Sequence, residues 1–260
     1  NGNPLRCKMV GEGGNLGLTQ KGRIEFAQKG GLLSTDAIDN SAGVDSSDHE
    51  VNIKILLNRV VESGDMTEKQ RNLLLAEMTD EVGALVLRHN RGQSHALSLA
   101  TSQAPERLAD HWRLITSLVR EGRLNREIEF LPTDAQIKKR MNKGSGLTRP
   151  EIAVLLAYSK IKLFEQLVED GIGDDPDLMT QIHSYFPSQL SKQFSNEMAT
   201  HPLSQEIVAG HVTNNIGNRM GPTFSTYVQE ETSTSALNLV RAYSAAEEIF
   251  AVPTIWNAIN

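Results

Sequence analysis

Residues 11–31 read GEGGNLGLTQKGRIEFAQKGG and hold seven glycines. A short apolar run over residues 5–10 precedes them, which is typical of a buried strand that ends in a loop. Thr19 is a suitable N-cap for a following helix, and Gly30 and Gly31 are suitable residues to end it. The segment is therefore predicted as a strand, a loop and a helix.

The next segment continues this alternation. LLSTDAI at residues 32–38 is short enough for a second strand, and the turn-forming DNSAG leads to a helix predicted from about Ser46 to Glu62. The order of strand, helix, strand and helix indicates the end of an α/β sheet. Since a sheet of two strands is not stable alone, we expect this part to pack on helices or to be incomplete.

Beyond residue 63 the pattern predicts helices only. Three capping boxes mark helix starts, at Thr67 with Gln70, Thr133 with Gln136, and Thr148 with Glu151. Residues 90–94, NRGQS, predict a helix break. The apolar spacing predicts later helices over residues 177–185, 187–198, 204–220 and 233–250. The predicted fold is mainly α, with a short α/β part at residues 1–63 and an all-helical domain at residues 64–260.

Composition restricts the class of protein. The net charge is −6 and the basic residues are scattered, so we expect no nucleic-acid partner. No apolar run approaches the ~20 residues of a membrane span. A lone cysteine, Cys7, excludes an internal disulfide and favours a buried position in a strand and a reducing compartment. Histidines in separate segments without a metal-binding spacing predict no metal site. Both ends of the chain look cut from a longer protein.

The glycine-rich loop fits neither common phosphate-binding motif. A G-x-G-x-x-G run from Gly11 would need glycine at position 16, where Leu16 stands, and no Gly-Lys-Ser/Thr follows. One interpretation is a tight turn that needs positive φ angles. The other is a surface where Gly13 and Gly14 let the backbone approach a flat ligand and Asn15 supplies an amide. Residue chemistry alone leaves these interpretations balanced.

The second segment adds polar groups that could bind an anion. Asn40 is predicted in a turn, and Ser47 is predicted in the first turn of the following helix. Free N–H groups and the positive end of the helix dipole favour a carboxylate there. The alternative is that Asp45, Ser46 and Ser47 only compete to cap the helix.

Together the two segments resemble the glutamate dehydrogenases. That family carries a Glu-Gly-Ala-Asn stretch after a strand, then Asp-x-x-x-Asn-Ala-Gly-Gly-Val and a serine. This sequence has Glu12-Gly13-Gly14-Asn15, then Asp36, Asn40-Ser41-Ala42-Gly43-Val44 and Ser47. The wording of these stretches, with GLTRPEIAVLLAYSK further on, is similar to the large bacterial NAD-specific enzymes. The chain departs from the small enzymes at Gly17, where they have proline, and at Asp48 and His49, where they have aromatic residues.

The resemblance implies roles for individual residues. Gly13, Gly14, Asn15 and Asn40 would bind the NAD cofactor, and Ser47 and Asn40 would bind L-glutamate or 2-oxoglutarate, with ammonia as the other product. The α/β part would be the remnant of a Rossmann-like nucleotide-binding domain. The catalytic lysine and aspartate are expected upstream of Asn1, so the chain alone should be inactive. A cytoplasmic homo-oligomer is expected. A non-catalytic helical interaction module is the alternative.

Overall fold

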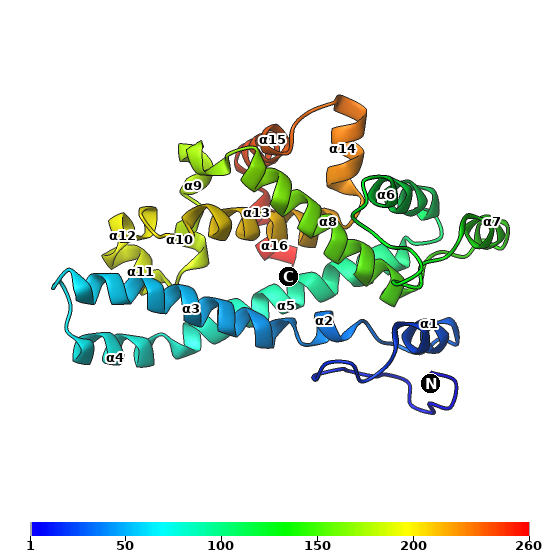
Figure 1. The fold of residues 1–260 in the computed structure, drawn as a ribbon, viewed down its shortest axis with the longest axis horizontal. Coiled ribbons are helices and arrows are strands. Elements are labelled where there is room, and N and C mark those ends of the chain that lie inside the picture. The colour runs from blue at the N-terminus through cyan, green and yellow to red at the C-terminus, as the bar shows by residue number, and fades with distance from the viewer. Residues whose placement is uncertain (1, 260) are drawn as a thin grey trace.

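The fold is mainly helical in the computed structural model, which describes residues 2–259 and the side chains of all of these except 257 and 259. Figure 1 shows the longer helices α3, α5, α8 and α13 stacked across the molecule, with α1 at one end. The first eight α-helices are α1 (Gln20–Gln28), α2 (Asp36–Asp39), α3 (Ser41–Glu62), α4 (Glu68–Glu77), α5 (Thr79–Ser102), α6 (Leu108–Arg120), α7 (Asp134–Asn142) and α8 (Arg149–Glu169). The 3-10 helix η1 (Ile172–Asp174) comes next. The remaining α-helices are α9 (Pro176–Met179), α10 (Ile182–Tyr185), α11 (Ser188–Gln193), α12 (Ser195–Ala199), α13 (Ser204–Met220), α14 (Phe224–Thr232), α15 (Ala236–Ile249) and α16 (Val252–Ile259).

The two predicted strands are wrong, since residues 2–259 contain no strand. Where they were expected, Met9 and Leu32 form one isolated parallel bridge. The N–H of Val10 donates to the Leu32 carbonyl and the N–H of Leu32 to that of Lys8, both at 2.9 Å. Two parallel segments without further strands cannot extend such a bridge into a stable sheet. Cys7 is correspondingly exposed, not buried in a strand.

The helix starts predicted at Thr19 and at the three capping boxes are confirmed. Thr19 caps α1, because its Oγ1 accepts a hydrogen bond from the Gly22 N–H at 3.1 Å. Each capping box is present, with the hydroxyl and the residue three positions later satisfying each other's backbone N–H. These boxes start α4, α7 and α8.

Helix α3 begins at Ser41, five residues before the predicted start at Ser46. DNSAG was predicted as a turn, but only Asn40 separates α2 from α3, and its φ and ψ of −94° and 7° let the chain pass almost directly between them. Gly43 lies inside α3, where a Cβ would come within 2.7 Å of Asn40 Oδ1. Ser47 consequently lies in the second turn of α3, not in the first.

Other helix boundaries differ where distant contacts decide them. The predicted break at residues 90–94 is wrong, because α5 continues through it. Gly92 faces Asn218 of α13 within this continuous helix, and a Cβ there would lie 3.4 Å from Asn218 Nδ2, an ordinary contact distance. The helix predicted over residues 187–198 is divided at Phe194, whose φ and ψ are −128° and 37°. The helix predicted over residues 177–185 is divided into α9 and α10. Helix α14 was not predicted.

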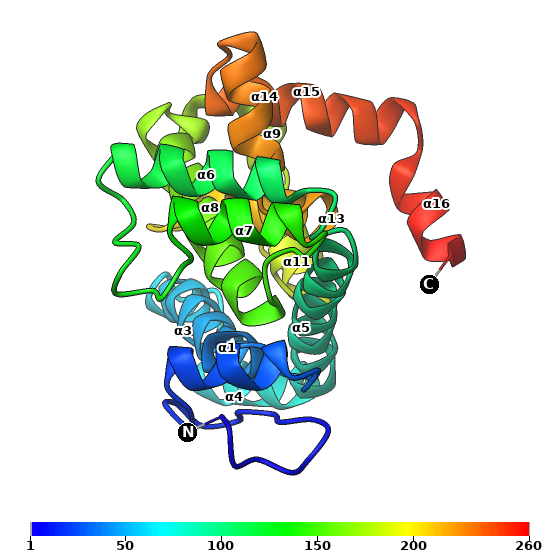
Figure 2. The same cartoon turned by 90° about the vertical axis from the view of Figure 1, so that its right-hand side faces the viewer.

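Two groups of buried apolar side chains form the core, and α8 contributes to both. Its C-terminal half, with Leu163 and Leu167, packs with Leu56 of α3 and Val208 of α13. Its N-terminal half packs against α5 and α6 in the second group. Figure 2 shows α15 and α16 projecting from this body, away from α1. The predicted boundary near residue 63 falls between α3 and α4, and a division into domains there stays a prediction.

None of the helices in residues 2–259 is both long and apolar enough to cross a membrane.

Candidate functional site

Two carboxylates of α2 hold the glycine-rich loop, which spans residues 11–18. The N–H of Glu12 donates to Asp39 Oδ2, and the N–H of Leu16 donates to Asp36 Oδ2, both at 2.9 Å. Leu16 has a φ of 60°, an unfavourable angle for a residue with a branched side chain, and its side chain is exposed. The bond to Asp36 therefore fixes a backbone conformation that leucine would not adopt readily alone.

A buried ion pair lies beneath the loop. Arg23 of α1 contacts Glu12 through Nε at 2.6 Å and Nη2 at 2.9 Å, and it also lies 3.2 Å from Asp36. Burial raises the pKa of Asp36, but the hydrogen bond from the Leu16 N–H and the charge of Arg23 outweigh burial and lower it below its ordinary value. Glu12 also accepts from the Leu18 N–H at 2.9 Å. One guanidinium thus connects the loop to α1 and α2.

This arrangement brings together the residues predicted to bind the cofactor. Asn40 Nδ2 lies 3.4 Å from Asn15 Oδ1, although 25 residues separate them. A Cβ added at Gly13 or at Gly14 would meet nothing within 4 Å, so the backbone there is accessible to a ligand. The loop and the junction of α2 with α3 form one polar surface with two amide groups.

Ser47 does not have the surroundings predicted for it. In the second turn of α3 its N–H lies within the helical hydrogen-bond ladder, beyond the first four residues whose N–H groups are free of it. The prediction of an anion site at a helix start is therefore wrong for this residue. Its side chain is exposed, so its hydroxyl remains accessible to a ligand.

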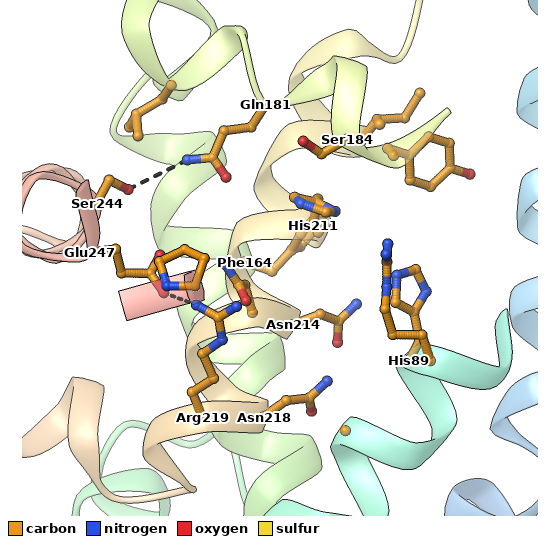
Figure 3. Close-up of a pocket in the computed structure, with 18 of the residues that line it drawn as sticks. His89, Phe164, Gln181, Ser184, His211, Asn214, Asn218, Arg219, Ser244 and Glu247 are labelled. Atoms are coloured by element: carbon orange, nitrogen blue, oxygen red, sulfur yellow. Dashed lines mark hydrogen bonds and ion pairs between the residues drawn. The ribbon is translucent and has the colours of Figure 1, made fainter. Parts of the chain in front are cut away.

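A large cavity lies on the other side of α3 and was not predicted. Its volume is about 2270 Å³, and its walls come from α3, α5, α10, α13, α15 and α16. Figure 3 shows His89 of α5 and His211 of α13 near the same part of the cavity, with Arg219 paired to Glu247 across it. Burial, with a smaller contribution from neighbouring charges, lowers the pKa of His211 to about 4. Asn15, Asn40 and Ser47 do not line this cavity.

Three ionisable side chains cluster at the cavity wall, where Asp45 and His89 line the cavity and His49 is buried behind them. His49 Nδ1 lies 3.3 Å from Asp45 Oδ1, one helical turn away, and His89 Nδ1 lies 2.8 Å from Asp45 Oδ2. Burial opposes ionisation of Asp45, but both imidazoles hold its pKa well below the usual range. Burial alone would lower the pKa of His49, and Asp45 raises it overall. The spacing of Asp45 and His49 was a visible signal, whereas His89 follows Asp45 by 44 residues and carried none.

Comparisons with known proteins show which family the chain is similar to. The family "Bacterial NAD-glutamate dehydrogenase, catalytic domain" matches residues 1–100, and "Glutamate dehydrogenase, C-terminal" matches residues 144–260. An NAD-specific glutamate dehydrogenase from Pseudomonas aeruginosa is 50% identical over 97% of this chain. Those from Halomonas elongata and Mycobacterium tuberculosis are 45% and 41% identical over all of it.

The chain spans 16% of the length of each of these curated relatives. The two family matches together extend over most of its residues, and one of them describes the catalytic domain. The chain belongs to the bacterial NAD-glutamate dehydrogenase family.

Proposed function

We propose that this chain forms one wall of the active site of an NAD-dependent glutamate dehydrogenase, which converts L-glutamate to 2-oxoglutarate and ammonia. The observation that carries the proposal is the meeting of Asn15 and Asn40 beside the open backbone of Gly13 and Gly14. The names of the relatives support the reaction. The enzyme would act in the cytoplasm as a homo-oligomer.

The exposed polar surface fits a nicotinamide cofactor. Asn15 and Asn40 offer amide donors and acceptors, and the two glycines have no side chain that would exclude a flat ring. When bound, NAD supplies the hydride acceptor for the reaction. The residues of this chain would orient its nicotinamide end, while the family's catalytic lysine and aspartate are proposed to precede Asn1. The bridge at Met9 and Leu32 would then belong to the edge of a Rossmann-like sheet.

Ser47 is proposed to bind the α-carboxylate of the substrate. The hydroxyl is exposed on α3, the helix that begins directly after Asn40, so a ligand at Asn40 can extend along this helix. With a rise of about 1.5 Å per residue, Ser47 lies roughly 10 Å along the axis from Asn40. This separation would let the α-carboxylate bind at Ser47 while the Cα of the substrate lies over the face of the nicotinamide ring.

The test replaces Ser47 with alanine in the full-length enzyme that carries this chain. We expect the KM for glutamate to rise by at least ~10-fold, because a charge-assisted hydrogen bond contributes about 1.5–3 kcal/mol. Ser46→Ala is the matched control, since the Ser46 hydroxyl already donates to the Ala42 carbonyl at 2.8 Å. Unchanged KM in Ser47→Ala would overturn the assignment.

A second measurement addresses the division of the site. NAD titrated into the isolated 260-residue chain should bind weakly or not at all, because the remaining walls are proposed to lie elsewhere. Tight binding would contradict this division. Absence of glutamate oxidation by the full-length protein would favour the alternative of a non-catalytic helical module.

A further inference from the structure

The cluster of Asp45, His49 and His89 has no role in the proposed reaction. Its three ligand-type atoms all lie within 4.8 Å of one another, although the residues come from α3 and α5. The three side chains differ in exposure, with His49 fully buried, and Asp45 and His89 at 23% and 27% exposed. The cluster therefore has one closed side and one side that faces the cavity.

The distances in the cluster suit a small divalent ion. Zinc binds histidine nitrogen and carboxylate oxygen at about 2.0–2.2 Å, which places two ligands of a tetrahedral site about 3.3–3.5 Å apart. His49 Nδ1 lies 3.3 Å from Asp45 Oδ1, His89 Nδ1 lies 2.8 Å from Asp45 Oδ2, and one ligand atom from each residue lies within 4.8 Å of the other two. We propose that Asp45, His49 and His89 bind a first-row divalent metal ion of the Zn²⁺ type, with a remaining coordination position open to the cavity.

The charges around the cluster favour a cation. Asp45 and Asp48 both contribute carboxylates on this face of α3, and Asp45 contacts two imidazoles. Among residues 2–259, neither carboxylate has a lysine or arginine nitrogen within 4 Å. Carboxylate oxygen supplies negative charge that a divalent ion would neutralise, and imidazoles bind such an ion in their neutral form.

The surrounding side chains hold the ligands in place. The Tyr185 ring stacks on His49 with centroids 4.4 Å apart, and its hydroxyl donates to Asp48 Oδ2 at 2.7 Å. Asn52 Nδ2 lies 2.8 Å from the same hydroxyl. Such outer contacts fix the orientation of metal-binding imidazoles. The His49 ring is consequently oriented before any ion binds.

The site is separate from the proposed substrate site. Residues two positions apart on an α-helix point about 200° apart, so Ser47 lies on the opposite face of α3 from Asp45 and His49. The metal-binding proposal consequently does not depend on the proposed function. An ion here could coordinate water or an anionic group of a small ligand in the cavity, which His211 and Arg219 also line.

The test measures metal content, not activity. The full-length protein is stripped with a chelator, dialysed against Zn²⁺, and analysed for bound zinc beside His89→Ala. His95→Ala is the matched control, because His95 is an exposed histidine on the same helix that also lines the cavity but lies outside the cluster. We expect His89→Ala to retain one zinc fewer per chain than the wild type and the control. Zinc sites elsewhere in the protein cancel in this difference.

Affinity and spectroscopy provide further readouts. Loss of a direct ligand should weaken Zn²⁺ binding by at least ~100-fold, since loss of an outer contact alone typically costs 10–100-fold. Co²⁺ should give visible absorption bands in the wild type that disappear in Asp45→Asn, which preserves side-chain shape if His89→Ala fails to fold. Equal zinc content in all variants, or wild-type protein without these cobalt bands, would overturn the proposal and leave a hydrogen-bonded cluster.

Discussion

Arg23→Met removes the guanidinium that connects the glycine-rich loop to α1 and α2. The side chains of Arg23 and Glu12 are only 6% and 3% exposed, so the variant leaves a buried carboxylate without its cation. Breaking a buried ion pair from one side typically costs about 3–5 kcal/mol. Glu12 would retain the Leu18 N–H as a donor, and Asp36 would retain that of Leu16. We therefore expect the loop to open locally while the helical core stays folded.

Glu12→Gln should be milder. Glutamine can still accept from Leu18 or from Arg23, and Arg23 keeps Asp36 at 3.2 Å. The change removes the charge of the acceptor, so the bond from the Leu18 N–H becomes neutral and the bond from Arg23 keeps a charge only on its donor, at a cost of about 1 kcal/mol. The two variants therefore separate the cost of an unpaired buried charge from that of a weaker hydrogen bond.

Hydrogen exchange of the amides of Leu16 and Leu18 provides the assay, because both N–H groups donate to carboxylates of this network. A loss of about 3–5 kcal/mol corresponds to roughly 10²- to 10⁴-fold faster exchange in Arg23→Met, and about 1 kcal/mol to less than ~10-fold in Glu12→Gln. Lys54→Met disrupts an exposed ion pair with Glu50 and should leave these amides unchanged. Wild-type exchange in Arg23→Met, or a larger effect of Glu12→Gln, would refute the reasoning.

Two further variants test the geometry and the electrostatics. Gly43→Ala places a Cβ 2.7 Å from Asn40 Oδ1 and should displace that amide. We therefore expect a several-fold higher KM for NAD. Gly83→Ala is the control, because a Cβ at Gly83 would meet nothing within 4 Å. Burial lowers the pKa of His111 from 6.5 to about 4, so its contribution to stability is complete above pH ~6.5 and falls as the pH decreases toward 4. Between pH 7 and pH 5 the wild type should lose about 2 kcal/mol more than His111→Leu in urea unfolding, and equal losses would contradict this.

Helix starts were predictable from the sequence because their stabilising contacts are local. Thr148 and Glu151 satisfy each other's backbone groups within one turn, so the pattern alone locates the start of α8. The absence of a strand around Met9 was not predictable, because a strand requires neighbouring strands and in residues 2–259 only Leu32 pairs with Met9. Gly92 looked like a helix break, but α5 continues through it, and its neighbour Asn218 belongs to a helix more than a hundred residues away.

The candidate site was also predictable only in part from the sequence. The resemblance identified Asn15 and Asn40, and the structure brings these two residues together, whereas their support by Arg23 and Asp36 had no recognisable motif. The expectation of no metal site followed from spacing along the chain. Helix α5 brings His89 to Asp45 across 44 residues, and no spacing pattern contains that contact.

Helix α3 connects all of these features, because its faces have different tasks. Ser47 is exposed on one face, while on the opposite face Asp45 lines the cavity and His49 is buried behind it. One helical turn further on, Ile53 and Leu56 anchor the helix in the core. An ion bound by Asp45 would connect the N-terminal part of α3 to α5. This part of α3 has fewer buried apolar residues than the rest of the helix. Such an ion would fix the position of Asn40 without touching the substrate, so its removal should affect cofactor binding through the placement of this helix.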